Sequence, residues 1–372
     1  MESVVQPAPR LPLELPAANA TGPPTDELPV ANTTGPPVVQ LLEKLPTTPA
    51  ISTRSSIDLF RPGLRLATSR DAELVACMLS GVIKIFKLDI GWGHASIGTP
   101  ASIDCTQVLD CCAAAFGNSL SYIKNGNVHS QGRVYEDGGA YAIAATRQGS
   151  VCFISGESLN SGRKVYALEG GSAFEISDPK TLPTLHSGIA TIDRFLNKIT
   201  AFWATSNGVL VRGVIRERPL QLTEPWTLRT FEPIAAIDWP DEMIVLYIDF
   251  HGAVMAHMWW QTEKSTEGSI AALDGLEDEI APAGSAHPYG AIVAVALERA
   301  AVVVWMDTRG AIRSACGPHR GPFEQFLVLD EGIAALHSPL ALGCDDASCT
   351  LRLWYLGHQG DLKFLPFRYR TT

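Results

Sequence analysis

The chain has 372 residues, of which 46% are hydrophobic and 18% charged, and its formal net charge is -10. This composition supports a large hydrophobic core and excludes a mostly disordered protein. Because no basic patch offsets the negative charge, the sequence argues against a nucleic-acid partner and against binding to an anionic membrane. No apolar run reaches the ~18 residues that a membrane-spanning helix needs, so we expect no membrane insertion.

The N-terminal segment differs in composition from the rest of the chain. It is rich in Pro, Thr, Ala and Gly, and Glu14–Pro24 is repeated imperfectly as Glu27–Pro37. Such frequent proline is incompatible with a helix or a central strand, so we expect an extended or disordered arm, residues 1–55, before a folded domain, residues 56–372. The first residues lack the basic and apolar regions of a secretory signal, which predicts a cytoplasmic protein.

Four segments in the C-terminal half repeat one pattern. An apolar run is followed by a β-branched and aromatic run, a glycine turn and a second apolar run. The four copies are Ile189–Ile215, Ile234–Trp259, Ile292–Ala315 and Ala334–Leu365. Short runs of this kind around glycine turns predict β-hairpins. The copies start roughly 40 to 60 residues apart, the spacing of four-stranded propeller blades.

Weaker copies extend the repeat toward the N-terminus at Leu64–Leu88, Asp110–Val128 and Tyr141–Ser155. They bring the number of modules to seven, whereas one irregular insertion would leave six. We therefore predict an all-β fold, a six- or seven-bladed β-propeller of four-stranded antiparallel blades. Gly268–Ala283 is the one candidate for a helical turn, and its acidic residues are expected in a solvated loop.

Familiar catalytic signatures are absent from the sequence. It contains no nucleophile elbow, no zinc-protease motif, no P-loop and no dinucleotide-binding glycine pattern. The eight cysteines lack the paired spacing of a zinc site and are expected to be buried free thiols. We predict no metal and no cofactor.

Aromatic residues recur near the ends of the repeat strands. They could wall a pocket for a mostly apolar small molecule or for the face of a sugar. Alternatively, each ring fills the wedge between neighbouring blades. The candidates for the wall are Trp203, Trp259, Trp305, Trp354 and Tyr355.

The repeat resembles that of the fungal fucose-specific lectins, which are six-bladed propellers. The closest copy is Ile234–Trp239 followed by Met243–Tyr247, and the likeness runs from about Phe60 to the end of the chain. In those lectins an Arg, a Glu and aromatic rings hold fucose at each blade junction. Here the Arg position reads Thr200, Ile244, Val302 and Arg352, and the Glu position reads Arg212, Ala256, Ser314 and Phe364. Because only Arg352 survives, the resemblance implies a scaffold that has lost fucose binding.

The chain is also similar to fungal hetero-Diels-Alderases of tropolone sesquiterpenoid pathways, which are lectin-derived propellers without the sugar-binding residues. This resemblance implies a cofactor-free cycloaddition between a tropolone-derived quinone methide and a humulene-type sesquiterpene. The partners would then be small molecules, a terpenoid and a tropolone, and a homodimer is left open. The residues that could donate to the tropolone oxygens are Arg212, His251, His257, Arg309 and Arg352. A carbohydrate-binding, fucose-type lectin of altered specificity and a non-catalytic interaction propeller remain alternatives.

Overall fold

The structure is a computed structural model of the whole chain. It describes seven N-terminal strands by their backbone and then residues 120–371, with gaps at 147–148, 157–162, 185–186, 194, 229–233, 261–273, 288–289, 299, 319–321, 337, 346–349 and 359–360. Side chains are described between residues 120 and 368, apart from those gaps and residues 196, 274 and 275. All described residues belong to one compact unit, residues 36–372.

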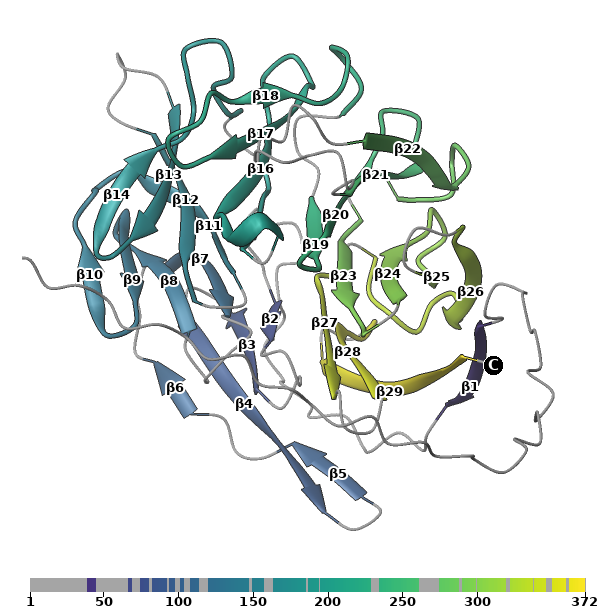
Figure 1. Cartoon of the computed structure of the whole chain (residues 1–372). Coiled ribbons are helices and arrows are strands. Elements are labelled where there is room, and N and C mark those ends of the chain that lie inside the picture. Colours follow the sequence, from purple (N-terminus) through teal and green to yellow (C-terminus); the bar gives the residue numbers. More distant parts are fainter. Residues whose placement is uncertain are drawn as a thin grey trace, which may run out of the picture. The chain divides into compact units, whose positions relative to one another are not determined.

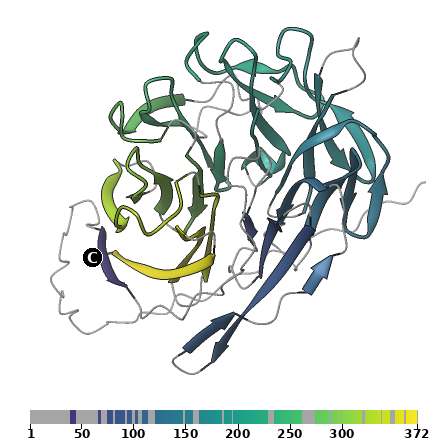
Figure 2. The same cartoon turned by 180° about the vertical axis from the view of Figure 1, so that it is seen from behind.

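The described strands form seven antiparallel sheets (Figures 1 and 2). The first contains β2 (Leu66–Thr68), β3 (Leu74–Leu79), β4 (Val82–Gly91), β5 (His94–Ile97) and β6 (Ala101–Ile103). The second contains β7 (Val108–Ala113), β8 (Leu120–Lys124), β9 (Asn127–Ser130) and β10 (Arg133–Tyr135). The third contains β11 (Ala140–Ala145), β12 (Val151–Gly156), β13 (Arg163–Glu169) and β14 (Ser172–Glu175).

The four clear repeats form the remaining sheets. β15 (Ile189–Ile192), β16 (Thr200–Ala204), β17 (Leu210–Val214) and β18 (Leu220–Gln221) make the fourth. β19 (Ala235–Asp238), β20 (Glu242–Ile248), β21 (Val254–Trp260) and β22 (Asp274–Ala281) make the fifth. β23 (Ile292–Ala296), β24 (Ala300–Met306), β25 (Ile312–Pro318) and β26 (Glu324–Leu329) make the sixth. β27 (Leu340–Asp345), β28 (Thr350–Leu356), β29 (Leu362–Thr371) and β1 (Val39–Lys44) make the seventh.

The sheets follow one another around a closed ring. Their innermost strands β2, β7, β11, β15, β19, β23 and β27 contact each other in that order, and β27 also contacts β2. The last sheet is completed by β1, which pairs with β29 and so joins a segment from near the N-terminus to the C-terminal strand. The predicted all-β propeller is therefore confirmed, and its described strands form seven sheets.

The second strand of each clear repeat is buried on both faces, because each sheet packs between two neighbouring sheets. Every residue of β16, β20, β24 and β28 is buried. This double burial explains why these strands are continuous apolar runs rather than alternating ones. The largest fully buried side chains are Trp203, Trp305 and Trp354, so these rings fill space between sheets.

One expectation about the chain is wrong. Within Gly268–Ala283, Asp274–Ala281 forms β22 instead of a loop or a helical turn. β22 pairs with β21 along the open edge of the fifth sheet, and Leu276, Glu277 and Glu279 are exposed there. An edge strand with polar residues lacks the apolar pattern by which a strand is recognised in a sequence. The described residues include one short 3-10 helix, η1 (Phe195–Asn197), and none of their helices could cross a membrane.

Candidate functional site

The structure distributes the predicted pocket-wall aromatics over several inter-sheet faces. Trp203 packs between the third and fourth sheets, Trp259 between the fourth and fifth, and Trp305 between the fifth and sixth. Tyr355 lies between the sixth and seventh sheets. Trp354 is adjacent to Tyr355 on β28 and therefore points to the opposite face of that strand, where its ring packs 4.9 Å from the Phe364 ring.

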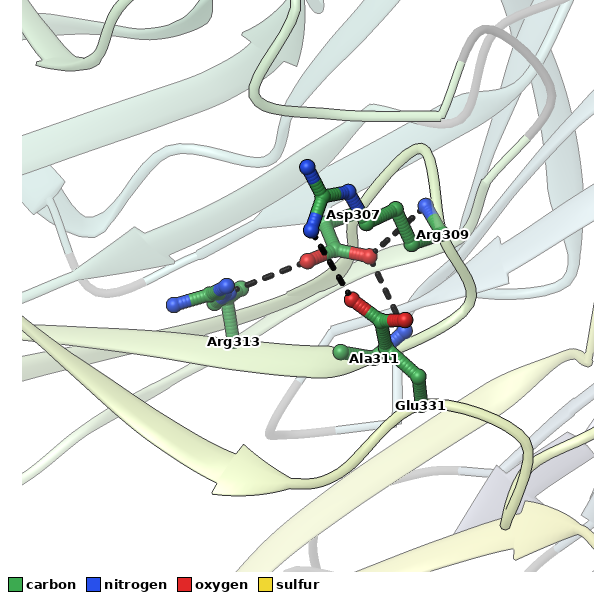
Figure 3. A network of polar contacts seen from close by, with 5 residues as sticks. All are labelled: Asp307, Arg309, Ala311, Arg313 and Glu331. Carbon is green, nitrogen blue, oxygen red and sulfur yellow. Dashed lines mark hydrogen bonds and ion pairs between the residues drawn. The ribbon is translucent and has the colours of Figure 1, made fainter.

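His251 and Arg309 lie on exposed turns and not between sheets. Each follows an aspartate whose Oδ1 accepts two backbone N–H bonds, from His251 and Ala253 to Asp249, and from Arg309 and Ala311 to Asp307. Figure 3 shows that the second of these aspartates also accepts a bond from Arg313 Nε, while the Arg309 guanidinium reaches Glu331 at 3.4 Å. Local hydrogen bonds to the aspartates stabilise these turns, and this explains why the glycine motif recurs along the chain.

Arg352 is buried on β28 and is held by a neighbouring carboxylate. Its Nη2 lies 3.1 Å from Asp345 Oδ2, and its exposed fraction is 5%. Because Leu351 and Leu353 pack against the sixth sheet, Arg352 points to the other face of the strand. Arg352 therefore belongs to the seventh sheet, which the sixth sheet separates from the fifth.

Three predicted residues come together at one place, between the fourth and fifth sheets. We use the name Arg212 cleft for this packed junction of two sheets and define it by Arg212, Leu222, Tyr247, Met255, His257, Trp259 and Glu277. Leu210 and Val214 of β17 pack in one cluster with Tyr247 and Trp259. Arg212 stands between Leu210 and Val214 and alternates in phase with them, so its side chain points to the same face.

On the fifth sheet the same alternation selects the other members of the cleft. Met255, His257 and Trp259 occupy alternate positions of β21. His257 pairs with Glu277 of β22 across the sheet. Leu222, which follows β18, and Met255 are half-buried members of the same cluster. The cleft therefore has an apolar interior and a carboxylate at its exposed rim.

Arg212 is the unusual group in this cleft. Its exposed fraction is 4%, yet Nε and Nη1 are buried without a hydrogen-bond partner. The nearest carboxylate is that of Glu217, whose Oε2 lies 3.9 Å from Nη2, while its Oε1 lies 2.6 Å from Lys198 Nζ. Burial lowers the pKa of Arg212 to about 10, and the charge of Glu217 opposes that shift. The guanidinium is therefore charged at neutral pH but poorly compensated.

An aromatic stack forms the wall on the fifth sheet. The His257 and Trp259 rings lie 4.2 Å apart with an interplanar angle of 7°, and His257 Nδ1 is buried without a partner. Burial lowers the pKa of His257, although Glu277 raises it. Tyr247 donates a hydrogen bond to Glu277 Oε1. Burial, followed by this bond and the charge of Glu277, raises the pKa of Tyr247 above its usual range.

The junction combines an aromatic stack with guanidinium donors that have no partner. A planar group could stack on the His257 and Trp259 rings. An oxygen that reached Nε or Nη1 of Arg212 could accept a hydrogen bond from it. Among the residues that the structure describes, no group of three or more His, Cys, Asp and Glu side chains could hold a metal ion. Cys152, Cys316 and Cys344 are buried free thiols as expected, and the other cysteine side chains lie outside the described residues.

Two polar members of the cleft, and the carboxylate nearest to Arg212, could not be identified from the sequence. The sequence predicts only a repeat strand for Tyr247 and a loop for Glu277, and it carries no signal that singles out Glu217. The alternation of Met255, His257 and Trp259 on one strand was a usable signal for a shared face. Pairing of β22 with β21 could not be inferred from composition, so the carboxylate of Glu277 could not be placed.

Comparisons with known proteins support the fold. Neither a protein-family model nor a curated protein sequence matches this chain. Among solved structures, the chain is similar to the BP39L lectin from Burkholderia pseudomallei, with a TM-score of 0.59, 15% identity, and coverage of 82% of this chain and 96% of the lectin. AofleA from Arthrobotrys oligospora gives a TM-score of 0.50 at 11% identity, covering 84% and 86%.

A third similar structure is a β-propeller domain that is not named as a lectin. The Cps50 (Swd1) β-propeller domain of Myceliophteria thermophila gives a TM-score of 0.51 at 10% identity, covering 86% of this chain and 98% of that domain. At these identities the likeness shows a lectin-like propeller fold and does not extend to function.

Proposed function

We propose that the protein binds a small, largely apolar organic molecule in the Arg212 cleft. We further propose that it is a fungal secondary-metabolite enzyme, which joins a tropolone-derived quinone methide to a humulene-type sesquiterpene by hetero-Diels-Alder cycloaddition. The observation that supports the proposal is the buried guanidinium of Arg212, whose Nε and Nη1 have no hydrogen-bond partner, on the face of β17 that carries Leu210 and Val214 of the cluster with Tyr247 and Trp259. The resemblance of the repeat to the fungal hetero-Diels-Alderases supplies the reaction class.

The cycloaddition requires few reactive groups from the protein. One carbon–carbon and one carbon–oxygen bond form as the π electrons of the heterodiene and the olefin are redistributed, and no atom leaves. Catalysis then needs an apolar surface that holds both partners in a reactive pose and a donor that polarises the heterodiene oxygen. Trp259 and Met255 would contact the hydrocarbon, and Arg212 would donate to the oxygen.

The test is an incubation of the purified protein with humulenol and a tropolone quinone-methide precursor. We expect a higher yield of adduct than in buffer and one predominant stereoisomer, with both effects lost in heat-denatured protein. Arg218→Met serves as the control variant, because Arg218 is exposed and lies outside the cleft. A racemic adduct formed at the background rate would refute the enzymatic proposal.

A lectin is the second candidate, favoured by the structural similarity to BP39L, which is named a lectin. The stacked His257–Trp259 wall beside Glu277 could also cover the apolar face of a sugar. A glycan array decides between the candidates. Binding of a defined glycan that is lost in Trp259→Leu and kept in Arg218→Met would favour the lectin.

A further inference from the structure

One connection between sheets carries a tryptophan at a position where later connections carry glycine. Between the fourth and fifth sheets, the N–H of Trp226 donates to Asn207 O in the glycine turn of the fourth sheet. Between the fifth and sixth sheets, the N–H of Gly284 donates to His251 O in the turn of the fifth sheet. Both residues have a positive φ, 66° for Trp226 and 79° for Gly284, and Gly332 in the connection to the seventh sheet has a φ of 75°. Trp226 therefore stands at a position that favours glycine.

Trp226 combines an unfavourable backbone conformation with an exposed ring. A bulky residue rarely adopts the left-handed region, which costs free energy that glycine does not lose. The exposed fraction of Trp226 is 71%, the largest among the exposed large hydrophobic residues that the structure describes. A ring that is so exposed contributes little to the packing of the sheets. Exposed tryptophans of this kind are typical of protein interfaces, where they contribute much of the binding energy.

A second exposed ring lies on the adjoining turn of the fifth sheet. The N–H of Phe250 donates to Thr227 O at 2.8 Å, so this turn is joined to the residue that follows Trp226. Phe250 is 52% exposed, whereas the turns of the fourth and sixth sheets have Ser206 and Thr308 at the same place. Two exposed aromatic residues therefore occur together where the repeat elsewhere has glycine or a hydroxyl. We name this place the Trp226 surface and define it by Glu224, Trp226, Asp249, Phe250 and His251.

The Trp226 surface contains a carboxylate without a basic partner. In the sixth sheet, Asp307 Oδ1 accepts two backbone N–H bonds, and its Oδ2 accepts a bond from Arg313 Nε at 3.1 Å (Figure 3). Asp249 accepts the same two backbone bonds, but six residues after it the fifth sheet has Met255 instead of an arginine. Among the residues that the structure describes, no side chain pairs with Asp249 Oδ2, and this half-buried carboxylate is in contact with solvent. The turn of the fifth sheet therefore lacks the cation that its counterpart has.

Charge favours a basic partner over a second copy of the chain. Glu224 is exposed two residues before Trp226 and adds a second carboxylate to the surface. No described Lys or Arg side chain forms an ion pair with Glu224 or with Asp249. A guanidinium stacks on an aromatic face and also binds a carboxylate, so this set of groups suits an arginine. Because the chain has a net charge of -10, its field attracts a basic segment and opposes association with its own copy.

We propose that the Trp226 surface is a docking site for a basic segment of another protein. An arginine of that segment lies against the Trp226 ring and pairs with Asp249, in the place that Arg313 has beside Asp307. Phe250 contacts an apolar part of the same segment. The surface includes neither Arg212 nor Trp259, so the proposal goes beyond the proposed function and does not depend on it.

The experiment compares two labelled dodecapeptides, one of alternating Arg and Gly and one in which Gln replaces every Arg. Fluorescence anisotropy measures their binding to the purified full chain. We expect the wild-type protein to bind the Arg peptide more tightly than the Gln peptide, and Trp226→Gly to weaken binding of the Arg peptide at least about fivefold. Trp226→Gly keeps the net charge, so a non-specific attraction would remain in this variant. Leu220→Ser, the control, removes an exposed apolar residue of β18 and should bind the Arg peptide as the wild type does.

Two further variants test the role of Asp249. Asp249→Asn keeps an oxygen for the two backbone bonds and removes the charge. Met255→Arg supplies the arginine that the sixth sheet has at this place, so it should occupy Asp249 within the chain. We expect both variants to bind the Arg peptide as weakly as Trp226→Gly. Circular dichroism verifies folding, and Asp249→Asn decides the point if Met255→Arg does not fold.

The stability of Trp226→Gly separates a binding role from a structural one. Because glycine relieves the left-handed strain, we expect this variant to melt at the same temperature as the wild type or higher. A clearly lower melting temperature would mean that the ring supports the fold, and it would overturn the proposal. Equal affinity for the two peptides, no binding of either, or unchanged binding of the Arg peptide by Trp226→Gly would also overturn it. Self-association of the wild type that Trp226→Gly abolishes, seen by analytical ultracentrifugation, would assign the surface to a second copy instead.

Discussion

The Arg212 cleft and its counterpart between the sixth and seventh sheets have the same backbone and different chemistry. Ser314 follows Asp307 at the distance at which Arg212 follows Thr205, and each pairs with the second strand of its sheet, Arg212 with Phe202 and Ser314 with Val304. We call the second place the Ser314 cleft and define it by Val302, Val304, Ser314, Cys316, Leu353 and Tyr355. Ser314 alternates in phase with Val302, Val304 and Cys316, which pack against Leu353 and Tyr355.

The difference between the clefts teaches that the repeat determines packing and a few substitutions determine chemistry. The Ser314 cleft is filled by small and aliphatic side chains together with the ring of Tyr355, and Ser314 is fully buried. The Arg212 cleft holds a cation with unpaired donors beside a flat aromatic wall. Under the proposed function, a ligand that accepts these hydrogen bonds would offset the cost of burying the group.

The largest expected effect comes from moving the charge into the apolar cleft. Ser314→Arg should lower the free energy of unfolding by at least about 3 kcal/mol, because it buries a long cation without a counterion. Ser314→Ala, the control, should lose only about 1 kcal/mol. Urea denaturation measures both. If Ser314→Arg and Ser314→Ala are equally stable, the Ser314 cleft tolerates a buried charge as the Arg212 cleft does.

The next effect concerns the opposite face of β17. In Gly213→Ala the new Cβ would lie 2.5 Å from Cη2 of Trp203 and 2.8 Å from the carbonyl oxygen of Ile176. We expect a loss of about 1–3 kcal/mol by overpacking. At Gly156 the nearest atom belongs to Tyr141 at 3.7 Å, so Gly156→Ala should be milder. If thermal denaturation shows that Gly156→Ala lowers the melting temperature more than Gly213→Ala does, the packing described around Arg212 is wrong.

The two buried arginines should respond differently to removal. Arg352→Met breaks a 3.1 Å contact with Asp345, and we expect it to cost about 1–2 kcal/mol, because that carboxylate is partly exposed. Arg212→Met removes donors that have no partner, so its stability should equal or exceed that of the wild type. Paired urea titrations without ligand test this contrast, and a large loss for Arg212→Met would mean that its donors are satisfied.

A smaller effect is expected for the carboxylate nearest to Arg212. Glu217→Gln should cost about 1 kcal/mol or less, because Glu217 is partly exposed and its ion pairs are screened by solvent. The same change should tighten tropolone binding, since a competing negative charge is lost. Calorimetric titration of this variant provides the measurement, and weaker binding would show that Glu217 helps the ligand.

The smallest effect is the pH dependence contributed by His257. Burial holds the pKa of His257 below its ordinary value, so the unfolded chain takes up this proton more readily than the folded protein. The resulting stability is complete above about pH 6.5, the usual histidine pKa, and declines as the pH falls toward the lower folded value. The difference in unfolding free energy between pH 7.5 and pH 5 should be smaller in His257→Gln, and an equal difference would exclude this contribution.

The sequence predicted the fold because its strands carry strong signals. The runs Ile244–Tyr247 and Ala301–Trp305 are continuous apolar strands beside glycine turns, and burial between two sheets is what such runs indicate. Completion of the seventh sheet by β1 could not be predicted, because pairing of Val39–Lys44 with β29 joins distant parts of the chain. The strand β22 could not be predicted for another reason, since the polar residues of this edge strand show no apolar pattern.

The candidate site was only partly accessible to sequence reasoning. The sequence predicts Arg212, His257 and Trp259 as site residues, and all three lie at one junction of two sheets. It also predicts Trp203 and Trp305, which face other sheets. In a strand that is apolar on both faces, the sequence does not show which neighbour a given ring will meet, since a change of one residue reverses its direction.

A crystal structure of the protein with tropolone tests the central claim most directly. The account predicts density for a planar ring against the His257–Trp259 wall, with a ligand oxygen within hydrogen-bond distance of Arg212 Nε or Nη1. Well-defined density for tropolone at another inter-sheet face, with Arg212 unchanged and unpaired, would contradict it.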